Sequence, residues 1–457
     1  MLISILLTNF IMKEELFIMS KVKNDSTEVK IGMGYDEDVY QAIPADRRVH
    51  WATMMMIFVG MWVSLYSVAI GYSIGQQLSV TPAIWSCIIG YGIAGIFAAL
   101  VGIIGVNKGL CSYVLAKAPL SWYGQSIIAL LMFIIIGFGS LGLQADAVGR
   151  SVGEVYPGLG GSARPIVSGL LCAIMMITAI KGVKWMGILS WITMPFFFII
   201  SIIATLIAVG RYPGGFSAIL AIQNNQMTFS RAIFLNAGAW AGFVMLMADV
   251  SRFLKTKKEA LTVIPIAFLI GAIPPICGVL LGATIKLPME AMFVSLGIGF
   301  IGLISIFGIA WTTNDNNAYT AGLAATTAIY PFKKVGRTKV TIVVAILGVI
   351  GAITGIGTLG VFQWIAAFHG SFNMSFVGVL IAHYFIVSKN GLVQTKGIAG
   401  IIAWLVSGLL TYFGLMPLPF LTAAALAFVV YLVLYNILEK PIFGESVVPQ
   451  LEPIKFK

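Results

Sequence analysis

Charged side chains are scarce in this sequence. Asp, Glu, Lys and Arg make up 10% of the 457 residues, whereas an average soluble protein carries roughly a quarter. Hydrophobic residues make up 59%, and the mean hydropathy is +0.98. A fold in water could not hide so much apolar surface, because most of a soluble protein's surface stays hydrated. The composition therefore excludes a disordered chain and a conventional soluble enzyme, and it predicts that lipid surrounds most of the chain.

Cysteine pairs and familiar catalytic motifs are missing as well. The 4 cysteines have no CxxC spacing, so neither a disulfide framework nor a metal site is expected. No Walker A, HExxH or GxSxG string occurs, so we expect that the protein is not an enzyme and binds no cofactor. GxGxxG strings begin at Gly90, Gly297 and Gly355. Each lies in or at the end of an apolar run and none follows a strand pattern, which favours close helix packing over dinucleotide binding.

Long apolar runs dominate the rest of the chain. A bilayer core about 30 Å thick needs roughly 20 apolar residues per helix. Twelve runs meet this description, with a soft boundary at Gly182 between the fourth and fifth. They are 52–75, 82–106, 124–145, 165–183, 185–209, 231–249, 260–284, 291–322, 338–357, 359–387, 394–413 and 418–438.

The net charge of +11 is distributed unevenly over the two sides of these predicted spans. Most Lys and Arg fall in loops on the side of the N-terminus, which predicts that both termini are cytoplasmic and argues against a nucleic-acid partner. We expect a multi-pass plasma-membrane protein with cytoplasmic tails at 1–51, expected to be poorly ordered, and 439–457. The opening run lacks the features of a signal peptide, and Met19 or Met33 are alternative starts.

Two of the predicted spans carry candidate breaks, at Val59–Ser64 and at Asn236–Gly242. Spans 1 and 6 are related by a shift of five helices, and an odd shift inverts the second copy in the membrane. A 5+5 inverted repeat follows, with repeats at 52–209 and 231–387 and two further helices at 394–438. The alternative is that these glycines only allow close helix packing. Short loops, no nucleotide site and broken helices are typical of a secondary carrier.

The eighth span contains the polar string Thr312–Asn317. Consecutive polar residues in a membrane helix are costly unless they face protein, water or an ion. The hydroxyls of Thr312 and Thr313, together with helix carbonyls, are hard oxygen ligands that suit sodium. The alternative is that Asn314–Asn317 already lie among lipid headgroups at the cytoplasmic helix end.

The string WTTNDN at 311–316, followed by AYTAGL, closely resembles the eighth helix of bacterial cytosine permeases in the nucleobase:cation symporter-1 family. IPADRRVHW at 43–51, ADVSRF at 248–253 and IAHY at 381–384 resemble other segments of that family. The resemblance implies an all-α membrane protein of LeuT-type fold, with ten core helices in a 5+5 inverted repeat plus two peripheral helices. It also implies symport of a nucleobase-like molecule with sodium or a proton.

The same resemblance implies a cation site and a substrate site. The cation ligands would be backbone carbonyls between Gly60 and Ser64, the Ile309 carbonyl, and the hydroxyls of Thr312 and Thr313. Trp240 would stack on the base, beside Ala239 and Gly242, where the family has serines. Phe133 and Phe138 lie near Ile135, which takes the place of the family's helix 3 tryptophan. Ile309 and His383 replace a family asparagine and aspartate, which points away from cytosine as the substrate.

The residues themselves leave further alternatives open. Amide candidates for a flat, polar ligand are Gln144, Asn236, Gln363 and Asn373. Gln144 could instead lie at the outer mouth with Asp146, and Asn373 could satisfy a backbone break. His369 and His383 are expected as packing or helix-end histidines. Asp249 and Arg252 are expected to form an ion pair at a helix end, and the alternative is that they form part of an inner gate.

The leading hypothesis is therefore a sodium-coupled nucleobase symporter that works by alternating access, with a small-molecule substrate and the bilayer as partners. One alternative is a proton-coupled carrier of a related heterocycle such as a hydroxymethylpyrimidine, hydantoin or allantoin. Another is a channel-like or sensory protein, although the spans show neither charge rings nor a repeated filter. Oligomeric state is left open.

Overall fold

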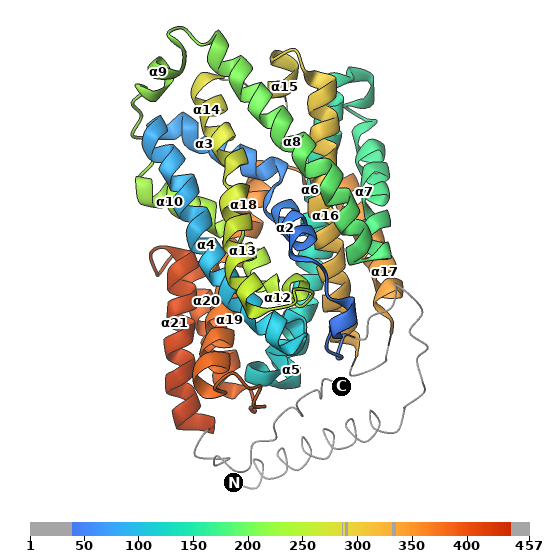
Figure 1. The fold of residues 1–457 in the computed structure, drawn as a ribbon, viewed down its shortest axis with the longest axis vertical. Coiled ribbons are helices and arrows are strands. Elements are labelled where there is room, and N and C mark those ends of the chain that lie inside the picture. Colours follow the sequence, from blue (N-terminus) through green and yellow to red (C-terminus); the bar gives the residue numbers. More distant parts are fainter. Residues whose placement is uncertain (1–38, 286, 288–290, 331–334, 440–457) are drawn as a thin grey trace.

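The computed structural model describes residues 39–285, 287, 291–330 and 335–439. Within these ranges the chain is helical, with no strand beyond one isolated bridge between Leu78 and Asn225. Figure 1 shows most helices running along the long axis, with α20 (Ile398–Tyr412) and α21 (Pro419–Leu434) standing together at one edge. The predicted all-α fold class is confirmed. Met19 and Met33, the two alternative starts, lie outside the described residues.

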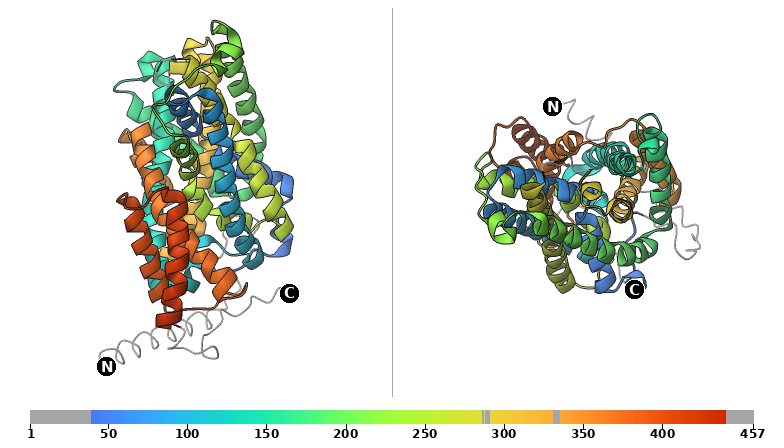
Figure 2. Two further views of the ribbon diagram at one scale, coloured as in Figure 1. Left: turned by 90° about the vertical axis from the view of Figure 1, so that its left-hand side faces the viewer. Right: turned by 90° about the horizontal axis from the view of Figure 1, so that it is seen from above.

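The helices of the first half are α2 (Trp51–Trp62), α3 (Leu65–Gln77), α4 (Val80–Lys108), α5 (Ser112–Ile134), α6 (Leu141–Val155), α7 (Arg164–Lys181) and α8 (Val183–Arg211). Those of the second half are α10 (Phe229–Gly238), α11 (Ala241–Met245), α12 (Met247–Ser251), α13 (Lys257–Gly271), α14 (Ile273–Thr284), α16 (Gly299–Ile329), α17 (Arg337–Ile353), α18 (Leu359–Phe368) and α19 (Met374–Ile381). Short π-helical segments join several of them: η2 (Ile135–Ser140), η5 (His369–Asn373) and η6 (Ala382–Val387). The two perpendicular views in Figure 2 show these helices gathered into one elongated bundle.

Each predicted span coincides with a helix or a broken helix. Seven helices of the described residues are long and apolar enough to cross a bilayer, and an eighth crossing results if α2 and α3 form one bent span. The remaining predicted spans fall on α10–α12, α16, α17 and α20. The count of twelve crossings stays a prediction, because α10–α12 are short pieces and α16 carries a polar string in its middle.

The first candidate break is present between α2 and α3, where the chain bends by 53°. Val63 and Ser64 are extended. Ser64 begins α3 through a capping box: its hydroxyl accepts from the Ser67 N–H at 3.3 Å, and the Ser67 hydroxyl accepts from the Ser64 N–H at 3.2 Å. The Val63 N–H donates the final helical bond of α2, to the Val59 carbonyl at 3.1 Å, and the Ser64 N–H turns to Ser67 instead of the Gly60 carbonyl.

The second candidate break is also present. Ala239 and Trp240 form a turn between α10 and α11, and a further interruption at Leu246 separates α11 from α12. Broken helices at corresponding places of two halves are the pattern expected of an inverted repeat.

The segment before α2 belongs to the predicted N-terminal tail, yet residues 39–50 pack against the bundle. Val39 and Ile43 are buried. Arg48 donates to the carbonyls of Val106 at 3.1 Å and Leu254 at 2.9 Å. The end of α4 and the residues after α12 offer unpaired carbonyls, and this segment satisfies them. Its order comes from contacts distant in sequence, which composition cannot reveal.

Glycine at position 90 allows α4 and α10 to approach each other. A Cβ at Gly90 would lie 2.6 Å from the Ile233 carbonyl oxygen and 2.6 Å from the Asn236 Cβ, whereas a Cβ at Gly92 would meet nothing within 4 Å. We expect Gly90→Ala to destabilise the protein by about 1–3 kcal/mol through overpacking. Gly92→Ala is the matched control, expected to stay within about 0.5 kcal/mol of the wild type. Thermal unfolding in detergent measures both, and equal midpoints for the two variants would contradict this packing.

Candidate functional site

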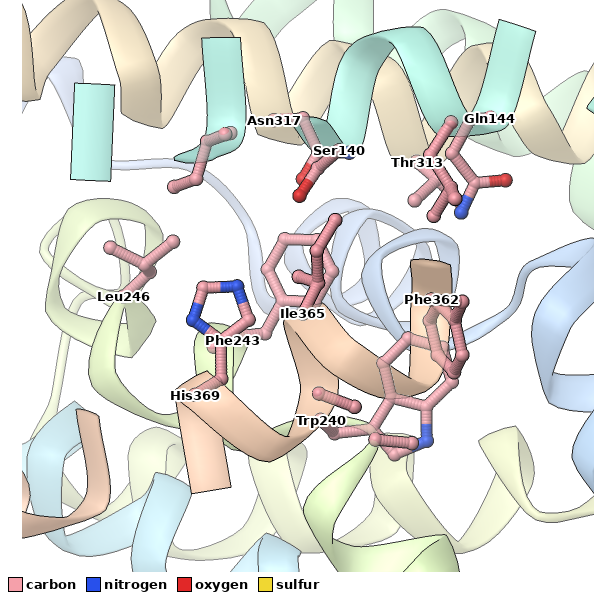
Figure 3. Close-up of a pocket in the computed structure, with 15 residues that line it drawn as sticks. Ser140, Gln144, Trp240, Phe243, Leu246, Thr313, Asn317, Phe362, Ile365 and His369 are labelled. Carbon is pink, nitrogen blue, oxygen red and sulfur yellow. The ribbon is translucent and has the colours of Figure 1, made fainter. Parts of the chain in front are cut away.

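A cavity lies in the middle of the bundle, beside the break between α10 and α11. It is lined from η2 and α6 by Ile136, Ser140, Leu143 and Gln144, from the break by Ala239, Trp240, Gly242, Phe243 and Leu246, from α16 by Thr313 and Asn317, and from α18 and η5 by Phe362, Ile365, Ala366 and His369. Figure 3 shows Trp240 and Phe362 at one end, His369 and Leu246 at the other, and Ser140, Thr313 and Asn317 across from them. Aromatic faces with a few polar groups are typical of a site for a flat, neutral ligand.

Trp240 forms part of an aromatic cluster at the break. Its ring centroid lies 6.2 Å from that of Phe243 in a stacked arrangement and 5.9 Å from that of Tyr91, edge-on. The side chain is only 2% exposed. Ala239 and Gly242, on either side, add little bulk and leave the backbone of the break open to the cavity.

The remaining candidate substrate residues separate into two groups. Gln144 lines the cavity, but Phe133, Phe138 and Asn373 are not among the lining residues. The π-helical segment η2 holds an extra residue per turn, so the face of this long helix shifts around its axis. Ile136 and Ser140 face the cavity as a result. The insertion has no sequence signature that spacing arguments could have used.

The polar string of α16 is buried within a continuous helix. Asn314–Asn317 are at most 5% exposed, and α16 continues to Ile329. Asn314 donates to the Leu141 carbonyl at 3.1 Å, and the Thr178 hydroxyl donates to the Asp315 carboxylate. The alternative of a helix end among headgroups is therefore wrong, because these side chains pack against neighbouring helices.

A cluster of oxygens joins α16 to the first break. The Thr313 hydroxyl lies 2.9 Å from the Val63 carbonyl oxygen and 3.0 Å from that of Ile309, and the Thr312 hydroxyl lies 2.9 Å from the latter. A Cβ at Gly60 would lie 3.4 Å from the Thr312 Cβ, so α2 and α16 are in close contact here. Hydroxyl and carbonyl oxygens are hard donors, and their gathering at a helix break fits a small cation such as sodium.

Within the predicted carbonyl stretch Gly60–Ser64, Ser64 and Val63 have different partners. Ser64 uses its hydroxyl to cap α3, and Val63 supplies the carbonyl that meets Thr313. Val63 lay within the predicted carbonyl stretch, but the sequence could not single it out, because its backbone carbonyl and not its side chain takes part. Among the described residues no group of three or more His, Cys, Asp or Glu side chains could hold a metal ion.

Other candidates lie away from the cavity. Asn236 donates to the Ala232 carbonyl within its own helix at 3.0 Å. Gln363 lines an adjacent cavity that shares Ala239, Phe362 and Ala366 with this one. Asp249 and Arg252 are fully buried: the Asp249 carboxylate accepts from the Ser112 N–H at 2.7 Å, and Arg252 donates to the Tyr319 hydroxyl at 2.8 Å. These two residues tie α12 to α5 and α16.

A membrane bundle with two broken helices beside a central cavity, lined by aromatic and a few polar side chains, has the architecture of a secondary transporter. The model of the family described as permeases for cytosine/purines, uracil, thiamine and allantoin matches residues 42–399. The chain belongs to this family, which confirms the predicted resemblance, and it is a membrane transporter rather than an enzyme.

The chain is similar to relatives in sequence and in fold. The cytosine permease of Escherichia coli strain K12 is 27% identical over 298 residues, which are 64% of this chain and 69% of the relative. The structure of Mhp1, a nucleobase-cation-symport-1 family transporter, closed with bromovinylhydantoin bound, has a TM-score of 0.74 at 16% identity and covers 88% of this chain and 95% of its own. A Na+-coupled sialic acid symporter has a TM-score of 0.64 at 15% identity, over 92% and 94%. The predicted LeuT-type fold is confirmed.

Proposed function

We propose that the protein imports a nucleobase together with sodium by alternating access. The observation that carries the proposal is the double position of Thr313. Its side chain lines the aromatic cavity, and its hydroxyl contacts the Val63 and Ile309 carbonyls of the oxygen cluster. A cation bound to those oxygens would hold Thr313, and with it this wall of the cavity, in the position that contacts the substrate. Binding of either ligand would then favour binding of the other, which is the coupling that symport requires.

The substrate proposal depends on the chemistry of the cavity wall. Trp240 offers a face for stacking, and Gln144, Ser140 and Asn317 offer hydrogen-bond partners across from it. Such a site suits a flat heterocycle with donors and acceptors on its edges. Relatives named for cytosine and a fold neighbour bound to a hydantoin support the same class of ligand. The direct substrate contacts proposed are Trp240, Ala239, Gly242 and Gln144, while Phe133, Phe138 and Asn373 would act from behind the cavity wall.

Sodium is preferred over a proton because of the ligand types. The cluster consists of two threonine hydroxyls and two backbone carbonyls, none of which titrates near neutral pH. Gly60 and Ser64 would complete the ion's surroundings from the first break. One sodium moving down 100 mV supplies about 2.3 kcal/mol, and a tenfold gradient adds about 1.4 kcal/mol. Together these would support several-hundredfold accumulation of a neutral solute.

The proposal includes the arrangement of the chain in the membrane. Repeat 1 spans 52–209 and the inverted repeat 2 spans 231–387, with 394–438 as peripheral helices. The tails at 1–51 and 439–457 face the cytoplasm, as the distribution of Lys and Arg predicts. Alternating access would then move one repeat-derived bundle against the other around the central cavity.

A thermal-shift screen of the purified protein tests the proposed function. Nucleobases, a hydantoin and allantoin are added one at a time, in sodium buffer and in matched potassium buffer. A ligand at one hundred times its Kd should stabilise the protein by about 2.7 kcal/mol. The proposal expects at least one nucleobase to raise the unfolding midpoint, and to do so more in sodium. A shift with hydantoin or allantoin alone, independent of sodium, would favour the proton-coupled alternative.

Cytosine is expected to bind at least tenfold more weakly than the best ligand. The resemblance to cytosine permeases implies that Ala239, Gly242 and Ile309 take places where those proteins have polar side chains. An unpaired polar group on a buried ligand costs about 1–3 kcal/mol, and 1.4 kcal/mol corresponds to one decade in affinity. A purine or modified pyrimidine should therefore be preferred. Competition uptake in cells without their own permeases measures the order, and cytosine emerging as the strongest competitor would contradict this expectation.

A further inference from the structure

Two buried histidines, His369 in η5 and His383 in η6, have different surroundings. His383 is bonded at both nitrogens: Nδ1 lies 2.7 Å from the Tyr431 hydroxyl, and Nε2 lies 2.9 Å from the Ser388 hydroxyl. His369 instead lines the cavity. Its Nδ1 lies 2.8 Å from the amide nitrogen of Asn373, and no partner for its Nε2 is found in the part of the chain that the structure describes. The expectation of a packing histidine with hydrogen-bonded nitrogens therefore holds for His383 but not for His369.

The contact with Asn373 fixes which nitrogen of His369 carries the proton. The amide nitrogen of asparagine is a donor without acceptor capacity, so Nδ1 of His369 is the acceptor in this pair. In a neutral imidazole the other nitrogen then holds the hydrogen. Both residues belong to η5, so their relative position is set by local backbone. Asn373 lies behind the cavity wall and acts there as a positioning residue that orients the His369 ring.

The His369 imidazole packs directly against Gly242, and only glycine at position 242 leaves room for the ring in the cavity wall. A Cβ built at Gly242 would lie 3.2 Å from His369 Nε2 and 3.0 Å from Cδ2. Any side chain there would crowd this edge of the ring. In Figure 3 the imidazole points away from its own helix, into the cavity and toward Ser140 on the opposite wall. The N–H donor thus faces the space that a ligand would occupy.

We propose that His369 is a specificity-determining residue that donates a hydrogen bond from Nε2 to a carbonyl oxygen of the substrate. The site would accordingly select oxo-substituted heterocycles over analogues that lack this carbonyl or carry an amino group in its place. An amino group would set one donor against another, and both would stay unpaired in a buried site. This inference rests on the proposed function, because it presupposes that the cavity binds a nucleobase-like ring.

Matched ligands test the inference. Dissociation constants are measured for hypoxanthine and purine, which differ by one carbonyl, for uracil and pyrimidin-2-one, and for adenine as the amino analogue. One buried hydrogen bond should make the wild type prefer the member with the additional carbonyl in the better-bound pair by about tenfold. In His369→Leu the preference should fall to within about twofold, whereas His369→Gln, which keeps an amide donor, should retain most of it. If His369→Leu does not fold, His369→Phe replaces it.

The controls separate this inference from the proposed function. His383→Gln changes the other buried histidine, which lies outside the cavity, and it should leave the ligand preference unchanged. An equal loss of affinity for both members of a pair in His369→Leu would assign His369 to packing and overturn the inference. Wild-type binding without any preference would overturn it as well, with the proposed function intact. If the wild type bound none of these rings, the proposed function itself would fail.

Discussion

Replacing both threonines of the oxygen cluster, Thr312→Ala with Thr313→Ala, should abolish the sodium dependence of ligand binding. The double variant deletes both side-chain oxygens of the proposed site and leaves backbone groups alone. A sodium ion needs several oxygens to replace its water shell, so losing two of them should prevent binding. Ligand titrations of the purified protein at increasing sodium concentration should show a rising affinity for the wild type and a flat response for the variant.

Two further variants keep this prediction specific. Thr312→Ser with Thr313→Ser retains the hydroxyls and should retain sodium dependence. Thr326→Ala removes a buried hydroxyl from the same helix that bonds only the Gly322 carbonyl at 2.7 Å, so sodium dependence should persist. A double alanine variant that still responds to sodium as the wild type does would show that the cation binds elsewhere.

Removing the aromatic face by Trp240→Ala should weaken substrate binding by about 1–3 kcal/mol, the contribution of one base–aromatic stack. Trp240 closes one end of the cavity, and its loss leaves the ligand facing a void between Tyr91 and Phe243. Trp240→Phe should cost less, because it keeps a smaller aromatic face. Isothermal titration with the best ligand of the thermal-shift screen measures both variants.

Trp404 provides the control for that measurement. It is equally buried at 2% exposure, but it lies on α20 and donates to the Phe372 carbonyl at 2.9 Å, outside the cavity. Trp404→Phe should leave the dissociation constant unchanged in the folded fraction. Unchanged affinity in Trp240→Ala, on the other hand, would remove Trp240 from the substrate site.

The broken helices and the polar string could be predicted because each violates the rules for a membrane helix. The polar residues at 312–317 are costly in lipid, so their presence in an apolar run indicates a special role. The glycines around Trp240 allow backbone conformations that break a helix. The structure places the breaks at Val63–Ser64 and Ala239–Trp240 within those stretches. These features are set by residues close together in the sequence, and the spacing of such residues can be analysed without a structure.

The choice between neighbouring side chains could not be predicted in the same way. The π-helical segments η2 and η5 add a residue to a helical turn, and they decide that Ser140 and His369 line the cavity while Phe138 and Asn373 do not. Gln144 and Asp146 are two residues apart, and helix geometry sends them in different directions. Asp146 is buried and contacts Arg150 at 3.1 Å and Arg164 at 3.4 Å, so only Gln144 reaches the cavity. Tertiary packing sets these outcomes.

Uptake into proteoliposomes under an imposed sodium gradient tests the central claim most directly. Purified protein is reconstituted in potassium-loaded vesicles and supplied with the best-binding nucleobase in radiolabelled form. The account predicts accumulation above the external concentration when sodium is outside, and simple equilibration when potassium replaces it, with the Thr312→Ala and Thr313→Ala double variant failing to accumulate in either case. Accumulation that follows an imposed pH gradient and ignores sodium would contradict the account.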